Sequence, residues 1–323
     1  MAETPAETAG TCVRCEADVL IGARYCGVCG AHLHVGTGPD ELVGTVVAER
    51  YRIISRIGQS ASGTVLQAEH VSMGKLVAVK LIHEELSENP AVVRRFERDF
   101  RAISRLTEMR TVGVVEFGRH EGRLYVVTEY LRGRNLASVV HEEGPLALPR
   151  IATLVADVSQ SLTEAHQHGI VHGGLKSENL FLTQVVEGRE MGKILDYGLA
   201  GLLEVQDEAA LGSGRGPVGV PQCMSPEQVS GTPVDPRSDI YSFGALIYLM
   251  LTGGHAFTAR TPVGVLKKHL VEDPMPPSER EPSLGIPPAV DAIVLRAMAK
   301  RPRDRYLEAV ALSDDLHAAI AAA

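Results

Sequence analysis

The order of two kinds of segment constrains this chain most strongly. Between residues 51 and 129, short runs of apolar and β-branched residues separated by glycines are typical of strands, and one helical pattern at 90–106 interrupts them. Beyond Gly133 the apolar residues recur at helical spacing, first over 148–168, which ends at Gly169. Strands followed by helices predict an α+β protein with a β-rich part and a helical part. This order alone identifies no function.

The individual segments can be placed more closely. The expected strands lie at 51–57, 64–70, 76–82, 112–117 and 124–129. The expected later helices lie at 237–251, 262–270, 288–299 and 306–320. We therefore expect a five-stranded unit with one helix, followed by a helical unit.

The composition is that of a soluble globular protein. The 323 residues are 45% hydrophobic and 22% charged, enough for one large two-lobed domain. The net charge of -8 disfavours a general nucleic-acid or acidic-membrane surface. The most apolar run, 240–251, is shorter than the ~20 residues of a membrane span and is expected to be a buried helix. The N-terminus lacks the features of a signal peptide, so we expect a cytoplasmic protein without a membrane span.

Four of the five cysteines form two Cys-x-x-Cys pairs near the N-terminus. They are Cys12, Cys15, Cys26 and Cys29. Two pairs in so short a span resemble a zinc ribbon, in which four thiolates bind a tetrahedral Zn²⁺ in a reducing compartment. Redox dithiols are the alternative, and His32 and His34 are second-choice ligands. A segment this short has no core, so metal binding would supply its folding energy. Cys223 is expected to be a packed thiol.

Several short motifs follow one another over residues 50–320. They are Ile57-Gly-Gln-Ser-Ala-Ser-Gly-Thr-Val65, Val77-Ala-Val-Lys80, His172-Gly-Gly-Leu-Lys-Ser-Glu-Asn179, Leu195-Asp-Tyr-Gly198, Ser225-Pro-Glu227 and Asp239-Ile-Tyr-Ser-Phe-Gly244. The ordered set resembles a bacterial, eukaryotic-type Ser/Thr protein kinase. The resemblance implies the two-lobed protein-kinase fold, an ATP site between the lobes and a role in signal transduction.

Composition, the cysteine pairs and the resemblance together divide the chain. We expect a disordered tail at 1–11, the zinc ribbon at 12–34, a linker at 35–49 and a kinase-like domain at 50–321. Within that domain, the N-terminal lobe covers 50–130 and the C-terminal lobe covers 131–321. Two features look structural. Glu227 and Arg305 are expected to form a buried ion pair, and Asp239 is expected to brace the loop at 172–179.

Five polar residues match the catalytic positions of the family. By the resemblance, Lys80 touches the α and β phosphates of ATP, and its partner on the helix is Asp99. Asp99 is one methylene shorter than the usual Glu, so the ion pair either draws the helix inward or forms poorly. Lys176 approaches the γ-phosphate. Asp196 and Asn179 offer the oxygen ligands that Mg²⁺ prefers.

The remaining implied nucleotide contacts come from apolar side chains and backbone. They are Ile57, Gly58 and Gly63 of the glycine-rich loop, Val65, Ala78 and Phe181 around the adenine, and Thr128, Glu129 and Leu131 of the hinge between the lobes. Ser60 stands where the middle glycine of the loop belongs, and its Cβ restricts the backbone there.

The departures from the family pattern concern one part of the mechanism. Gly174 replaces the aspartate that accepts the proton of the substrate hydroxyl, and Gly173 replaces the preceding arginine. Val220 replaces the threonine whose hydroxyl would bond that aspartate, and Ser213 is the only hydroxyl residue between Gly198 and Ser225. A positioned base contributes about 10²–10⁴-fold in rate, so its loss predicts impaired phosphotransfer.

Three hypotheses follow from this pattern. The favoured one is a pseudokinase that binds ATP, with Mg²⁺, and acts as a scaffold or regulator through protein partners of its kinase surface and zinc ribbon. An active or weakly active Ser/Thr kinase is the first alternative. An adaptor that binds no nucleotide is the second, with Ser60 and Asp99 as signs of a decaying pocket. The oligomeric state is not indicated.

Overall fold

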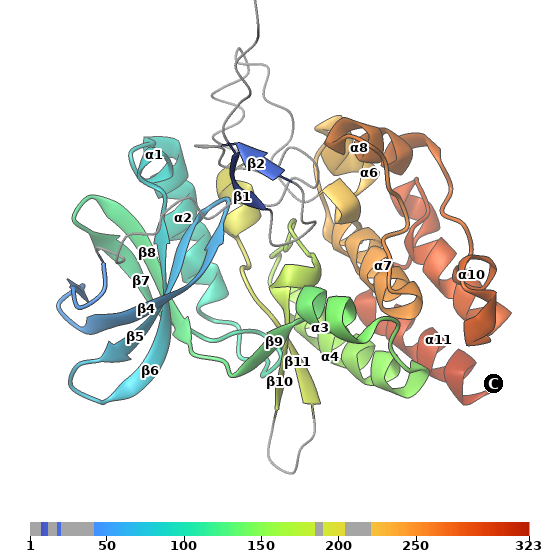
Figure 1. Ribbon diagram of the computed structural model, residues 1–323, viewed down its shortest axis with the longest axis horizontal. Helices are drawn as coiled ribbons and strands as arrows, with labels where there is room; N and C mark the ends of the chain where they lie inside the picture. Colours follow the sequence, from blue (N-terminus) through green and yellow to red (C-terminus); the bar gives the residue numbers. More distant parts are fainter. Residues whose placement is uncertain (1–7, 12–17, 21–41, 185–189, 204–220, 323) are drawn as a thin grey trace, which may run out of the picture.

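A computed structural model describes residues 8–11, 18–20, 42–184, 190–203 and 221–322. Two lobes lie side by side, one built on a β-sheet and the other on helices (Figure 1). The sequence order of strands followed by helices is therefore confirmed as a two-lobed α+β fold. Among the described residues, no helix combines the length and apolarity that crossing a membrane requires.

The N-terminal lobe is an antiparallel sheet of six strands in the order β3-β4-β5-β6-β8-β7. The strands are β3 (Val46–Val47), β4 (Tyr51–Ser60), β5 (Gly63–His70), β6 (Lys75–Ile82), β7 (Val114–His120) and β8 (Arg123–Glu129). Helix α1 (Glu84–Ser87) and helix α2 (Pro90–Ile103) follow β6. Phe96 and Phe100 of α2 pack on each other at 4.6 Å between ring centroids, and both contact Phe117 of β7 at 5.9 Å. This aromatic cluster fixes α2 against the sheet.

Two boundaries differ from the prediction. Strand β3 lies inside the expected linker at 35–49 and adds a sixth strand to the predicted five. The amide of Gly44 donates to the Ile53 carbonyl, and the amide of Ile53 donates to the Thr45 carbonyl, both at 2.9 Å. Residues 42–50 are therefore hydrogen-bonded to the N-terminal lobe, with Val46–Val47 in its sheet, and a two-residue strand has too little periodicity to be recognised from sequence.

The N-terminal tail also contains a strand. Strand β1 (Thr8–Thr11) pairs antiparallel with β2 (Asp18–Leu20), and β1 lies in the segment predicted to be a disordered tail. The two strands bracket Cys12 and Cys15. All four cysteines of the predicted zinc ribbon lie outside the described residues, so that site stays a prediction.

The C-terminal lobe combines helices with a small three-stranded sheet. Its helices are α3 (Leu136–Glu143), α4 (Leu148–Gln167), α6 (Pro226–Ser230), α7 (Pro236–Thr252), α8 (Pro262–Val271), α9 (Pro277–Arg280), α10 (Pro288–Ala297) and α11 (Ala309–Ala321). The sheet, in the order β11-β10-β9, contains β9 (Gly133–Asn135), β10 (Leu180–Gln184) and β11 (Glu190–Ile194). Short 3₁₀ turns occur at η1 (Ser177–Asn179), η3 (Pro221–Cys223), η4 (Pro282–Leu284) and η5 (Pro302–Asp304). All the predicted helices are present, whereas α3, α6, α9 and the small sheet were not predicted.

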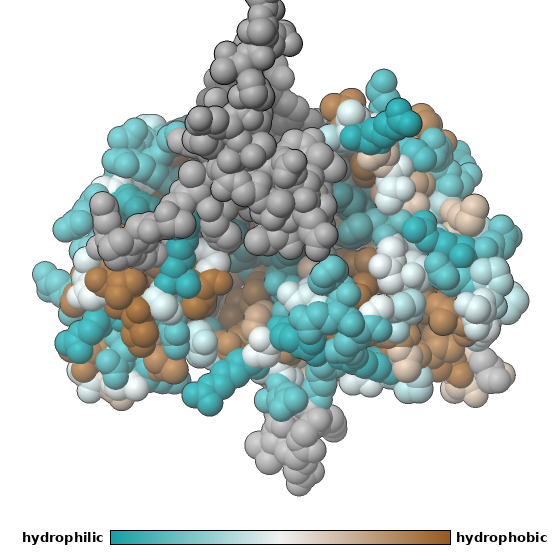
Figure 2. Space-filling model, in the orientation of Figure 1, coloured by the Kyte–Doolittle hydropathy of each residue, from teal (hydrophilic) through white to brown (hydrophobic). Residues whose placement is uncertain are grey.

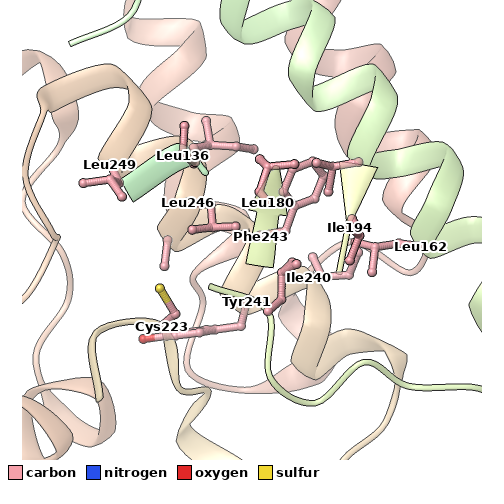
Figure 3. Close-up of a cluster of buried hydrophobic side chains, with 14 of the residues drawn as sticks. Leu136, Leu162, Leu180, Ile194, Cys223, Ile240, Tyr241, Phe243, Leu246 and Leu249 are labelled. Atoms are coloured by element: carbon pink, nitrogen blue, oxygen red, sulfur yellow. The ribbon is translucent and has the colours of Figure 1, made fainter. Parts of the chain in front are cut away.

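Helix α7 forms the centre of this lobe. It begins with Pro236 after the capping residue Asp235 and ends at Gly253, whose φ of 70° is left-handed. Its residues 238–252 are all buried, as predicted for the apolar run at 240–251. Figure 3 shows Phe243 and Leu246 of α7 among side chains from other elements, including Leu180 of β10. With no Trp in the chain, aliphatic residues fill most of the core.

Candidate functional site

The predicted site residues lie between the two lobes, where the space-filling view shows a recess with apolar residues at its base (Figure 2). Lys80 on β6 is opposite Val65 of β5 and Val126 of β8, so its strand is paired on both sides. Its side chain is 8% exposed, and its ammonium donates to Oδ2 of Asp196 at 2.7 Å. The lysine and the aspartate of the two predicted motifs, 116 residues apart, therefore meet.

Asp196 is held in an ionised form. Burial alone would raise the pKa of its carboxyl, but the nearby ammonium groups of Lys80 and Lys176 lower the pKa below its ordinary value. Its backbone is left-handed, with φ of 64°, a conformation that Asp tolerates better than most residues. The result is a fixed negative charge at the end of the buried lysine.

Asp99 does not pair with Lys80 in the structure, which is the second of the two outcomes that its short side chain left open. Its carboxylate instead accepts from Nε of Arg95 at 3.3 Å and from Nε of Arg98 at 2.9 Å. Arg95 lies one helical turn earlier on α2, within easy reach of so short a side chain. The Lys80 ammonium is bonded to Asp196 instead. Asp99 nevertheless lies beside the segment 195–198, since a Cβ atom added to Gly198 would be 3.8 Å from Cβ of Asp99.

The loop at 172–179 is braced by Asp239 of α7, as predicted. The Asp239 carboxylate accepts from the amide of His172 at 2.8 Å and from the amide of Gly173 at 2.9 Å. Its side chain is buried at 1% exposure, and Nε2 of His166 lies 2.8 Å from Oδ2. Nε2 of His172 is in turn 2.9 Å from the Leu195 carbonyl. The brace thus joins the loop to the segment that carries Asp196.

Asn179 and Asp196 each present an oxygen ligand suited to magnesium. The amide of Leu195 donates to the Asn179 carbonyl at 2.8 Å, and Nδ2 of Asn179 donates to the Gly174 carbonyl at 3.0 Å. These contacts leave an amide oxygen and a carboxylate as hard ligands. No group of three or more His, Cys, Asp or Glu suited to a metal occurs among the described residues. A Mg²⁺ ion here would therefore take its other ligands from phosphates and water.

Gly174 faces a helical turn that the sequence did not predict. Residues 199–203, directly after Gly198, are helical. A Cβ atom on Gly174 would lie 3.0 Å from Cβ of Ala200 in that turn, tighter than ordinary van der Waals contact. A Cβ on Gly201 would lie 2.3 Å from Nη2 of Arg95. The turn is thus packed between the loop at 172–179 and helix α2, and Ala200 occupies the space beside the position of the missing aspartate.

The residues expected around the adenine come from both lobes. Ala78 of β6 is opposite Thr128 of β8, and Val65 lies one strand away on β5. Phe181 comes from the other lobe, on β10. The hinge is fixed by a contact that sequence reasoning missed: Nζ of Lys193 donates to Oε1 of Glu129 at 2.7 Å. The remaining hinge residue, Leu131, directly follows β8.

The glycine-rich loop is held by hydrogen bonds at its tip. Gly63 is required, because a Cβ there would lie 2.1 Å from the Leu81 carbonyl oxygen, whereas one on Gly58 would meet only Cβ of Val65 at 3.8 Å. Nε2 of His83 lies 3.2 Å from the Ser60 carbonyl, and the His83 amide donates to the Ser62 carbonyl at 3.0 Å. His83 was missed because no motif marks it. Ile57, at the base of the loop, is exposed.

The structural pair Glu227 and Arg305 is confirmed. Nη1 and Nη2 of Arg305 donate to the two carboxylate oxygens of Glu227 at 2.6 and 2.9 Å, and the arginine side chain is fully buried. Burial would raise the pKa of Glu227, but Arg305 and the Ser238 hydroxyl lower it below the ordinary value. Cys223 is also buried, which raises the pKa of its thiol to about 12 and confirms a packed, unreactive group.

A sheet lobe and a helical lobe that together present a buried lysine, an aspartate and a braced loop define the protein kinase class of fold and site. The protein kinase domain family matches residues 51–307, and the chain belongs to that family.

Known relatives agree with this assignment. The chain is 36% identical over 281 residues to serine/threonine-protein kinase pkn3 of Myxococcus xanthus, covering 86% of this chain and 51% of that protein. It is 35% identical over 279 residues to PknB of Mycolicibacterium smegmatis, covering 84% and 43%. The chain therefore spans about half or less of the length of these relatives. The crystal structure of the Mycobacterium tuberculosis PknI kinase domain superimposes with a TM-score of 0.67 at 22% identity, covering 85% of this chain and 98% of that one, which supports the fold.

Proposed function

We propose that this protein binds ATP with Mg²⁺ and transfers phosphate weakly or not at all, acting as a signalling scaffold or regulator. The observation that carries the proposal is the contrast at the site. The contact of Lys80 with Asp196 at 2.7 Å keeps the nucleotide-facing charges together. The position of the base is Gly174, and Ala200 packs against it.

The charges of the site fit a magnesium nucleotide. Lys80 and Lys176 supply positive charge for phosphates, while Asp196 and Asn179 supply oxygen ligands for the cation. When bound, Mg²⁺ would neutralise the charge on the phosphates. The hinge and the apolar residues near it would hold the adenine, and the glycine-rich loop would cover the phosphates.

Proton transfer is the step that these residues do not support. A substrate hydroxyl must lose its proton during transfer, and a positioned base contributes about 10²–10⁴-fold. Phosphoryl transfer depends mostly on positioning and on charge stabilisation, so the remaining residues would sustain only a slow reaction. The helical turn at 199–203 adds to the impairment, because it packs beside Gly174.

We assign protein docking to the kinase surface and to the N-terminal zinc ribbon. Strand β1 pairs with β2, and Cys12 and Cys15 lie between them in the sequence. A closed four-cysteine zinc site is structural rather than catalytic. The cytoplasm, where thiols stay reduced, is the compartment that suits this module.

An active Ser/Thr kinase is the second candidate, and one observation favours it. Lys80, Lys176, Asn179 and Asp196 are all present, and the relatives of the chain bear kinase names. An adaptor that binds no nucleotide is disfavoured. A buried lysine paired with an aspartate does not stabilise the fold better than an apolar residue would, so the pair is better explained by nucleotide binding.

Two measurements separate the candidates. ATP with Mg²⁺ should raise the melting temperature of the full chain, and an Asp196→Ala variant should lose the shift. An unchanged melting temperature, supported by calorimetry without heat of binding, would indicate the adaptor. Transfer of labelled phosphate to a generic protein substrate should be at background. Robust transfer that disappears in Asp196→Ala would reject the pseudokinase.

A further inference from the structure

The outer face of helix α2 carries a row of arginines. The residues are Arg94, Arg98, Arg101 and Arg105, and all four are exposed. Their spacing of four, three and four residues places them on one side of the helix, opposite the buried Val92, Phe96, Phe100 and Ile103. A further turn of the backbone follows the end of α2 and carries Arg105, whose amide donates to the Ala102 carbonyl at 3.1 Å. The row is about 16 Å long.

Most of this positive charge is not balanced by neighbours. Within the described part of the chain, Arg94, Arg101 and Arg105 form no ion pair, and Arg98 pairs only with Asp99 while remaining 73% exposed. The whole chain has a net charge of -8. The row is therefore a local concentration of positive charge on an acidic protein. Repulsion among its arginines does not favour the folded chain.

We infer that this arginine row is the docking surface for an acidic segment of a partner protein. Guanidinium groups bind carboxylates through paired, directional hydrogen bonds, and arginine is enriched among the residues that dominate interfaces. The row is one residue wide, which suits a short helix or strand with several Asp or Glu side chains. The negative charge of the rest of the molecule opposes a long polyanion or an anionic membrane.

The row is connected to the nucleotide site through Asp99. Arg98 holds Asp99 at 2.9 Å in an exposed ion pair, and such pairs are weak. A partner carboxylate on Arg98 competes with Asp99 for the same guanidinium. Asp99 then loses one of its two arginine contacts and becomes freer to turn toward Lys80. Docking is therefore expected to tighten ATP binding, a step that rests on the proposed function, whereas the docking itself does not.

The test uses the full chain and a fluorescein-labelled poly-L-glutamate peptide of about a dozen residues. The charge-reversal variant is Arg94→Glu with Arg101→Glu and Arg105→Glu, none of which contacts Asp99. A matched control carries the same change in charge at three exposed arginines on other elements: Arg52→Glu, Arg260→Glu and Arg303→Glu. Fluorescence anisotropy should show at least a tenfold weaker peptide affinity in the first variant and less than a twofold change in the control. Equal losses in the two variants would overturn the docking surface.

Two further arms decide the partner class and the coupling. Tighter binding of single-stranded RNA or of phosphatidylserine vesicles than of the peptide, lost in the same variant, would overturn the acidic protein partner. Saturating peptide should tighten ATP binding about fivefold, and Asp99→Asn should keep peptide binding but lose this effect. Peptide binding with an unchanged ATP affinity would refute the coupling. If ATP does not bind with or without peptide, the proposed function fails, while the anisotropy result still decides the docking surface.

Discussion

Restoring a carboxylate at position 174 tests the proposed function most directly. The backbone of Gly174 is not left-handed, so an aspartate there is compatible with the loop. The adjacent Gly173 has a left-handed φ of 65°, at which a side chain would be strained, so it is kept as glycine in the test. If proton transfer alone is missing, Gly174→Asp should raise phosphotransfer toward the 10²–10⁴-fold that a base supplies.

The structure predicts that the single variant recovers only part of this gain. The new Cβ would lie 3.0 Å from Cβ of Ala200, so the turn at 199–203 must shift by a few tenths of an ångström or move away. Overpacking of this kind costs about 1–3 kcal/mol, and about 1.4 kcal/mol corresponds to a tenfold change in rate. Adding Ala200→Gly removes the methyl group that is contacted. The double variant is therefore expected to exceed Gly174→Asp by about tenfold.

The assay is transfer of labelled phosphate at saturating Mg·ATP, with ATP affinity and urea stability measured for each variant. Ala200→Gly alone should give no gain, which controls for loosening of the turn. The reasoning is refuted if the double variant binds ATP as the natural chain does, stays folded, and still transfers no more phosphate than an Asp196→Asn variant.

Three other perturbations test separate parts of the molecule. Lys80→Met should weaken ATP binding by at least tenfold in calorimetry; unchanged affinity would place the phosphates elsewhere. Glu227→Gln should cost about 3–5 kcal/mol in urea unfolding, because it leaves the buried Arg305 unpaired. The pKa of Glu227 is lowered in the folded state. The ionised carboxylate therefore stabilises the fold at pH values above its ordinary pKa of 4.5, and this stabilisation is lost as the pH falls through the folded-state pKa. Over that fall in pH, the natural chain should lose free energy of unfolding more steeply than Glu227→Gln. One zinc per chain is expected by mass spectrometry and should be lost when Cys12 and Cys26 are changed to Ser; full zinc content in that variant would reject the ribbon.

The sequence could predict those features that depend on periodicity or on a motif. Helical spacing located α7 and its burial, because a helix that is apolar on every side over most of its length has only the interior of the lobe to occupy. The motifs located the contacts of Asp239 with the loop and of Glu227 with Arg305, since each partner has its own recognisable sequence context. These contacts join segments far apart in the chain.

The features that sequence reasoning missed depend on which groups meet in space. The sequence left open whether Asp99 reaches Lys80, and it did not indicate that Arg95 and Arg98 on the same helix would bind this short side chain instead. The helical turn at 199–203 is short, follows Gly198 and has Gly201 at its centre, so its composition gives no helical signal. Its conformation depends on packing against other elements.

That packing links the missing base to the arrangement of helix α2. The turn at 199–203 fits against the loop because residue 174 has no side chain, and on its other side Gly201 lies directly against the guanidinium of Arg95. Arg95 in turn holds Asp99 away from Lys80. A side chain at position 174 would press on Ala200 and thereby disturb the contact with Arg95. The glycine therefore does more than remove a proton acceptor: it also permits the arrangement in which Lys80 pairs with Asp196 and not with Asp99. Displacing the turn should consequently change the partner of Asp99 even in a chain that has no catalytic base.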